Sequence, residues 1–114
     1  MNEYVKFTEV MPTSNSVKQG ESLNVLVGAI NKTDKPLEIS AAIWGKVENE
    51  WKKLLSRSYD LAPNEHRHLY FNIPAECFSS KYWQLDEIEE IELHASENCP
   101  SENTEGILVF VKNN

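Results

Sequence analysis

The chain has 114 residues, of which 40% are hydrophobic and 25% are charged, with three Trp, four Tyr and four Phe. This length suits one ordinary domain, and the aromatic content is too high for an intrinsically disordered chain. Eighteen acidic residues against eleven Lys and Arg give a formal net charge of −7, which argues against a nucleic-acid partner because like charges repel. We therefore expect a single folded domain over residues 1–114.

The N-terminus has no basic segment followed by an apolar one, so it does not resemble a signal peptide. No later run approaches the roughly 18 consecutive apolar residues that a membrane-spanning helix needs. The sequence thus predicts a soluble protein without a membrane partner and with a cytoplasmic location. If the chain is a fragment of a secreted protein, the expected location is extracellular instead.

Short runs in which apolar and polar residues alternate predict β-strands along the whole chain. Clusters of Pro, Gly, Asn, Asp and Ser separate these runs, and segment 47–51 predicts a hairpin turn. Residues 79–86 are less regular and predict one short helical turn. The seven predicted strands are 4–10, 23–29, 37–43, a return through Leu55 and Tyr59, 69–73, 91–95 and 107–111.

The clearest alternation is Leu69, Phe71 and Ile73, which fixes the inward face of its strand. Seven short strands in about 110 residues are typical of an all-β protein. We expect an immunoglobulin-like antiparallel two-sheet sandwich, and a closed barrel with a similar number of strands is the alternative geometry.

Three segments resemble those of bacterial immunoglobulin-like and fibronectin-III-like modules: Gly20-Glu-Ser-Leu-Asn-Val-Leu-Val, Asn31-Lys-Thr-Asp-Lys-Pro and Leu61-Ala-Pro-Asn-Glu. The resemblance covers about residues 18–74 and implies that the first segment is the second strand and that the last leads into the fifth. The Cys pattern of antibody domains is absent. The resemblance implies a fold and no particular function, since such sandwiches serve many functions.

The two cysteines are predicted to lie at opposite ends of this fold, because Cys77 follows the fifth strand and Cys99 follows the sixth. A strand of seven or eight residues is about 25 Å long. A disulfide requires Cα atoms within about 7 Å, so we expect two unpaired thiols. Unpaired thiols agree with a reducing compartment.

The three histidines invite comparison with a metal site, since His66 and His68 share one face of a strand and His94 offers a third imidazole. Strand alternation turns all of them outward, and the fifth and sixth strands lie in different sheets of the expected fold. We therefore predict exposed histidines on opposite surfaces and no metal site.

Catalytic motifs are missing from the sequence. There is no nucleophile turn and no Gly-rich phosphate loop, and only four Gly occur in the chain. A dense run of carboxylates is more typical of a solvated face than of an acid–base pair. That run comprises Asp86, Glu87, Glu89, Glu90 and Glu92. We predict neither enzymatic activity nor a cofactor.

One candidate binding feature is acidic. Glu90 and Glu92 project outward beside His94, and Glu87, Glu89 and Glu97 are near in sequence. Such a region steers and selects a basic protein partner. The alternative is that these carboxylates keep a sheet edge soluble and unpaired.

The second candidate feature is aromatic. Trp44 is predicted on the outside of the third strand, and Tyr82 and Trp83 lie in the crossing between the sheets, whereas Trp51 is expected to be buried. Exposed aromatic residues serve protein interfaces and also stack on sugar rings, but aromatic residues in such a crossing also cap the core. Two functions remain: an acidic protein-interaction or inhibitory module, and a carbohydrate-binding module.

Overall fold

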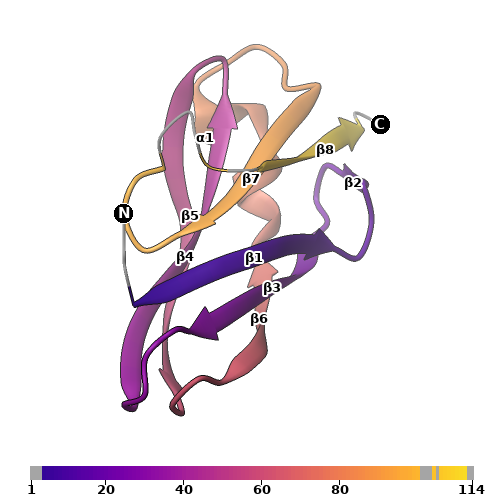
Figure 1. Cartoon of the computed structure of the whole chain (residues 1–114). Coiled ribbons are helices and arrows are strands. Elements are labelled where there is room, and N and C mark those ends of the chain that lie inside the picture. The colour runs from indigo at the N-terminus through magenta and orange to yellow at the C-terminus, as the bar shows by residue number, and fades with distance from the viewer. Residues whose placement is uncertain (1–3, 101–103, 105, 113–114) are drawn as a thin grey trace.

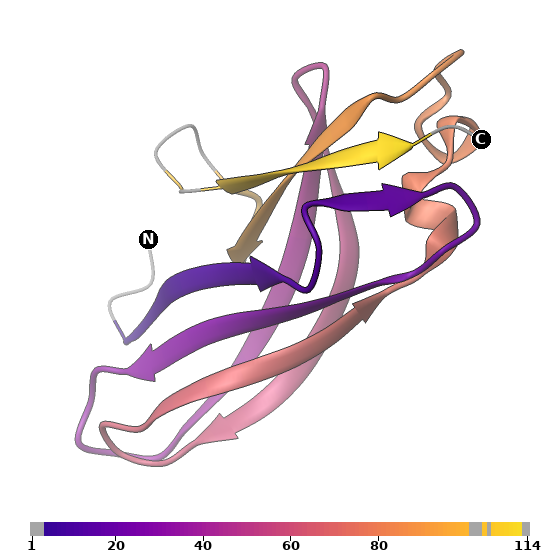
Figure 2. The same cartoon turned by 90° about the vertical axis from the view of Figure 1, so that its right-hand side faces the viewer.

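The computed structural model describes residues 4–100, 104 and 106–112, and it consists of two β-sheets packed face to face (Figures 1 and 2). The three-stranded sheet has the order β1-β3-β6 and the five-stranded sheet has the order β2-β8-β7-β4-β5. The predicted all-β two-sheet sandwich is confirmed. The strands found in the described part of the chain are β1 Val5–Pro12, β2 Ser16–Lys18, β3 Leu23–Asn31, β4 Leu37–Val47, β5 Glu50–Leu61, β6 His66–Ile73, β7 Glu90–Ser96 and β8 Gly106–Lys112.

β2 is a strand that the sequence did not predict. The chain leaves the three-stranded sheet at Pro12, which has no N–H to donate to a neighbouring strand. It crosses to the other sheet, where β2 pairs in parallel with β8. Val17 is buried there, but a single apolar residue between polar neighbours gives no alternation signal.

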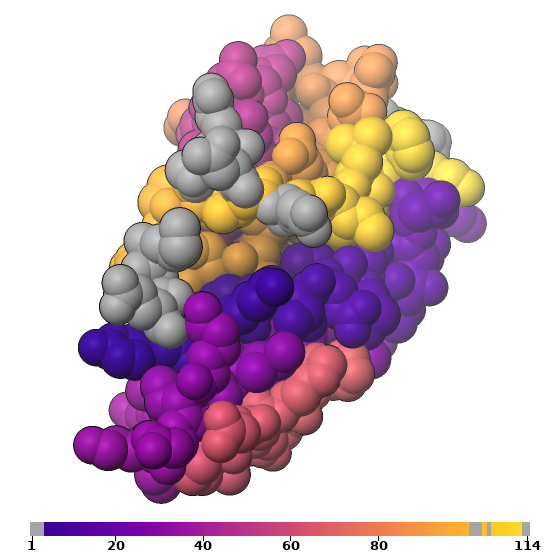
Figure 3. Space-filling view, in the orientation of Figure 1, coloured from indigo at the N-terminus to yellow at the C-terminus, as the bar shows by residue number. Residues whose placement is uncertain are grey.

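The inner faces of the two sheets form one hydrophobic core. Leu69, Phe71 and Ile73 are at most 1% exposed, which confirms the predicted inward face of β6. Each such side chain contributes about 1.5–3 kcal/mol when it is fully buried. The alternate residues of the same strands project from the other face of the three-stranded sheet, away from the core. Figure 3 shows β1 between β8 on one side and β3 and β6 on the other.

The predicted hairpin between β4 and β5 is present, with Glu48 and Asn49 both at positive φ, as a two-residue turn requires. The register then shifts: Trp44 pairs with Lys53 while Ile43 pairs with Leu55. This β-bulge reverses which residues of β5 face the core. The expectation that Trp51 is buried in the core is therefore wrong, because Trp51 lies half-buried on the outer face.

The crossing from β6 to β7 contains the 3-10 helix η1, Ala75–Phe78, and the short helix α1, Ser80–Trp83. The helical turn predicted at 79–86 is thus present as α1, and η1 is a second turn just before it that the sequence did not predict. The Ser79 hydroxyl accepts a hydrogen bond from the Tyr82 N–H at the start of α1, and Gln84 ends it in the left-handed conformation. Neither helix in these ranges is long and apolar enough to span a bilayer.

β5 is a long strand at the edge of its sheet, and side chains cover this edge. Arg67 donates to the Asp60 carbonyl, and the Cys77 thiol faces the Leu54 carbonyl. From β5 to β6, the Tyr59 hydroxyl donates a hydrogen bond to the backbone carbonyl of Tyr70, 2.8 Å away. These contacts occupy backbone carbonyls that would otherwise attract another strand.

Candidate functional site

The outer face of the five-stranded sheet brings together most of the predicted binding residues. β4 pairs with β7, so that Trp44 lies opposite His94 and Lys46 lies opposite Glu92. Because side chains alternate across a strand, these four residues all project from the same face. Trp44 and the acidic strand, two separate candidate features in the sequence, therefore share one surface.

On this face, β7 and β8 form a mixed strip that we name the acidic-apolar strip, composed of Glu90, Glu92, Leu108 and Phe110. Glu90 pairs with Phe110 and Glu92 pairs with Leu108. Phe110 is 48% exposed and Leu108 is 39% exposed. Each carboxylate thus has an exposed apolar neighbour directly across the strand pair. Leu108 and Phe110 were missed by the sequence analysis, although they alternate with Ile107, Val109 and Val111.

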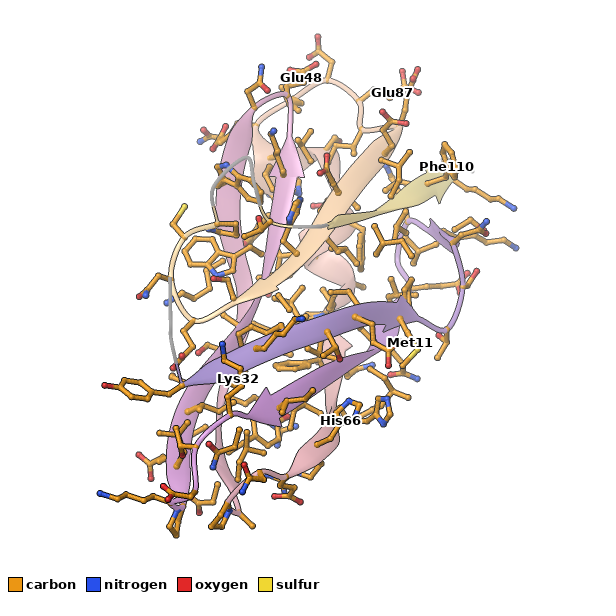
Figure 4. The ribbon with its side chains drawn as sticks, viewed as in Figure 1. Met11, Lys32, Glu48, His66, Glu87 and Phe110 are labelled. Carbon is orange, nitrogen blue, oxygen red and sulfur yellow. The ribbon has the colours of Figure 1, made fainter. Side chains whose placement is uncertain are left out.

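The hairpin tip adds carboxylates to the same end of the sandwich. Glu48, Glu90 and Glu92 line a small hollow together with Lys46 and Leu108. Figure 4 shows Glu48 and Glu87 at the same end of the molecule. The sequence could not assign Glu48 to this region, because its place depends on the pairing of β4 with β7.

Glu97 does not belong to this acidic end, although it was grouped with Glu87 and Glu89 by sequence. It follows the last residue of β7, whereas Glu90 begins that strand. Its carboxylate lies 3.4 Å from the backbone N of Ser40 on β4. The expectation of one acidic region that includes Glu97 was wrong, because the seven residues of β7 separate Glu97 from Glu87 and Glu89 at the other end of the strand.

His94 faces outward as predicted, but it is only 3% exposed, so the expectation that it points into solvent was wrong. The Trp51 indole lies edge-on to the imidazole at 4.7 Å between ring centroids. Nε2 is 2.8 Å from Glu92 Oε1, and Nδ1 is 3.0 Å from Thr104 Oγ1. On the other side the ring rests on Gly106, where a Cβ atom would overlap it. Both ring nitrogens are therefore satisfied, as a buried imidazole requires.

Trp44 and Trp51 are both half-buried on this outer face, and each has a lysine above it. The Lys53 ammonium lies 5.4 Å from the centroid of Trp44, and that of Lys46 lies 5.4 Å from the centroid of Trp51. Such cation–π contacts contribute about 0.5–1 kcal/mol at exposed sites. The two indoles therefore form an aromatic and basic surface next to the acidic-apolar strip.

Tyr82 and Trp83 lie apart from this face. Trp83 is 2% exposed and its indole N–H donates to the Cys77 carbonyl at 2.8 Å. It therefore offers no surface to a partner, and its selection as a candidate binding residue was wrong. Aromatic residues in the crossing cap the core, which was the alternative reading. Tyr82 is half-buried beside it, with Lys52 above its ring at 5.1 Å.

Both cysteines are free, with Cys77 buried and Cys99 exposed. Burial, helped by the negative charge of Glu76, raises the pKa of the Cys77 thiol to about 11, while its hydrogen bond with Tyr82 acts in the opposite direction. Cys77 therefore remains a protonated thiol at neutral pH, which makes it a poor nucleophile.

The histidines of β6 are exposed, as predicted, and lie on the three-stranded sheet, whereas His94 lies on the five-stranded sheet. The predicted separation of His66 and His68 from His94 is thus confirmed.

No family model and no curated protein matches the chain. Solved β-glucosidases resemble it in structure. One from Erythrobacter marinus matches 95% of this chain with a TM-score of 0.76 at 16% identity. One from intestinal bacteria, involved in saponin metabolism, has a TM-score of 0.78 at 13% identity, and one from Listeria innocua has 0.70 at 20%. The chain spans only 15–16% of the length of these proteins, and likeness at such identities shows the sandwich fold alone.

Proposed function

We propose that this chain is a non-enzymatic module that binds a basic protein partner through the acidic-apolar strip. The observation that carries the proposal is the cross-strand pairing of Glu90 with Phe110 and of Glu92 with Leu108. The net charge of −7 supports a partner of opposite sign. The module acts by occupying its partner, as a scaffold or as an inhibitor.

The two kinds of side chain on the strip have separate roles. Glu90 and Glu92 attract and orient Lys or Arg side chains, which mainly raises the association rate. Phe110 and Leu108 supply apolar area that leaves water on binding, and aromatic anchors of this kind carry much of the energy of an interface. A partner segment that alternates basic and apolar residues matches this pattern.

The test captures partners from a lysate of the source cells on immobilised wild-type protein, identifies them by mass spectrometry and then measures the affinity of the purified partner. We expect a partner with a basic segment whose affinity falls as salt is added. Phe110→Ser should weaken binding by about tenfold or more, as loss of an interface anchor does. The double variant Glu90→Gln/Glu92→Gln should mainly slow association.

Matched controls are available on other surfaces. Leu108→Ser removes the second apolar side chain of the strip. Leu26 lies on the three-stranded sheet and is 37% exposed, nearly the same fraction as Leu108, so Leu26→Ser is its control. Glu38, exposed at the far end of β4, provides Glu38→Gln as a charge control. Equal affinity of the strip variants and their controls, or affinity that does not depend on salt, would disprove the proposal.

A second candidate function is carbohydrate binding by the Trp44 and Trp51 surface. Two half-exposed indoles on one sheet face favour it, since indoles stack on sugar rings. The lysines above both rings count against it, because they occupy the faces that a sugar would need. A glycan array read by intrinsic Trp fluorescence tests this function, with Trp44→Phe and Trp51→Phe as variants. A flat response across all glycans would remove it.

We infer a reducing, cytoplasmic location, which the two free thiols support. Cell fractionation with an antibody to the chain would test it, and recovery of the protein outside the cell would contradict it.

A further inference from the structure

We propose that His66, His68 and Glu9 form a surface site for one divalent transition-metal ion of the zinc, copper or nickel class. The site lies on the outer face of the three-stranded sheet, away from the acidic-apolar strip, and uses two imidazoles and one carboxylate. It does not involve His94, which the fold keeps on the other sheet.

The third ligand comes from β1 and reaches β6 across the strand between them. Glu9 pairs with Gly28 on β3, and Gly28 pairs with His68 on β6. Gly28 has no side chain, and the space where its Cβ atom would lie is filled by Thr8 Oγ1, with Glu9 beside it: the Cγ and Oε1 atoms of Glu9 lie 3.0 and 3.3 Å from that position. As a result Glu9 Oε1 lies 3.0 Å from His68 Nε2.

The β-bulge in β1 is what places Glu9 on this face. The register shifts between Phe7, which pairs with Ala29, and Glu9, which pairs with Gly28. Without the shift, the next outward position after Phe7 would be Thr8. Thr8 has too short a side chain to reach β6 across Gly28.

Two distances on this face are within the range that a shared ion requires. Two imidazoles bound to one zinc at about 2.0 Å from each nitrogen have ring centroids roughly 5–6 Å apart. The rings of His66 and His68 are 5.6 Å apart and tilted by 40°. Neighbouring ligand atoms at about 2.1 Å from an ion lie roughly 3.0–3.4 Å from each other, which agrees with the contact between Glu9 and His68.

The three donors do not yet converge, and in the described part of the chain no three His, Cys, Asp or Glu side chains already form a ligand set. His66 completes the site by rotating. Its side chain is exposed, and exposed rotamers interconvert within nanoseconds. Figure 4 shows His66 on β6 pointing away from the five-stranded sheet.

Imidazole nitrogens and a carboxylate oxygen are ligands that zinc, copper and nickel accept. Three protein donors leave at least one position for water. Lys6 pairs with Ile30, which in turn pairs with His66, so Lys6 projects from the same face. Its positive charge lowers the affinity of the site for a metal ion.

The test titrates untagged protein with ZnCl2 and, separately, NiCl2 by isothermal calorimetry, with NMR spectra to locate the ion. We expect one ion per chain, with shifts confined to the amides around 9, 28 and 66–68. His66→Gln and His68→Gln each remove a direct metal ligand. Either variant should lower the metal affinity by roughly tenfold or more, since tenfold is already the typical loss when a residue that only hydrogen-bonds a ligand is replaced. Glu9→Gln should weaken binding less, because a neutral amide still offers an oxygen.

His94→Gln is the matched control, because it removes the third imidazole from the other sheet and should leave the metal affinity unchanged. Far-UV circular dichroism confirms that each variant is folded. Unchanged affinity in His66→Gln would overturn the proposal and leave Glu9 and His68 as a hydrogen-bonded pair. Saturable binding in the double variant His66→Gln/His68→Gln would also overturn it.

Discussion

The outer faces of the two sheets differ in how much of them the rest of the chain covers. On the three-stranded sheet, outward residues such as His66, His68 and Tyr70 are exposed. On the five-stranded sheet, Ala42 and His94 also point away from the core and yet are 1% and 3% exposed. Strand alternation therefore assigns a side chain to a face, while its exposure depends on what folds over that face.

His94 is covered by one outward aromatic residue and one connection. Trp51 reaches His94 from β5, and Thr104, from the connection between β7 and β8, reaches it from the other side. On the three-stranded sheet, Glu9 crosses Gly28 to reach His68, and both of these side chains stay exposed to solvent. The five-stranded face thus holds a small second cluster around His94, next to the exposed acidic-apolar strip, whereas the outward histidines of the three-stranded face are open to solvent.

The two glycines under these contacts give the largest contrast in stability. Gly106→Ala places a methyl group into the His94 imidazole, which is held on all sides, and overpacking of this kind costs about 1–3 kcal/mol. Gly28→Ala overlaps Thr8 Oγ1 and Glu9, which both lie on the edge strand β1. Among the described residues, Thr8 Oγ1 has no hydrogen-bond partner to lose when the side chain turns, and Glu9 can swing into solvent, so the cost should be smaller. Urea unfolding of both variants measures the difference, and equal losses would contradict the contrast between the faces.

The second contrast is between two histidines that each contact a glutamate. His94→Gln should destabilise the fold by about 1–2 kcal/mol, because the substitution removes a buried imidazole whose two ring nitrogens are both hydrogen-bonded. His68→Gln should stay within about 0.5 kcal/mol, since its contact with Glu9 is solvent-exposed. Thermal unfolding in the absence of metal ions measures both. A larger loss for His68→Gln would mean that the open face is more tightly organised than its exposure indicates.

The third contrast is between the two thiols at alkaline pH. An unfolded Cys loses its proton above about pH 8.5, whereas the folded chain keeps the Cys77 proton up to about pH 11. The unfolded state then binds fewer protons, so the stability that Cys77 contributes is complete below pH 8.5 and is lost as the pH rises toward 11. Urea unfolding between pH 8 and 10.5 should show a shallower decline for Cys77→Ala than for wild type. Cys99→Ala serves as the control and should keep the wild-type slope.

The smallest effect is one of reactivity and leaves stability unchanged. Native protein should react rapidly with a thiol reagent at Cys99 and only on unfolding at Cys77, because Cys99 is exposed and Cys77 is buried. Mass spectrometry after brief alkylation distinguishes the two. Rapid modification of Cys77 would show that η1 opens readily.

Local patterns predicted much of the fold. Alternation at Leu69, Phe71 and Ile73 identified the inward face of β6, and the hairpin at Glu48 and Asn49 followed from its turn residues. These features depend on neighbours within a few residues, so a single sequence contains them. The orientation of Trp51 could not be predicted in this way. A bulge reverses which residues of β5 face the core, and the residue types around it do not indicate a bulge.

The sequence by itself predicted a two-sheet sandwich with histidines on both sheets, and it fixes the net charge at −7. Only the tertiary structure decided which acidic residues meet apolar ones, that His94 is buried, and that Glu9 reaches His68 over Gly28. The physical reason is that strand order, register and bulges join residues far apart in the chain. Alternation fixes only the side of a strand from which each residue projects.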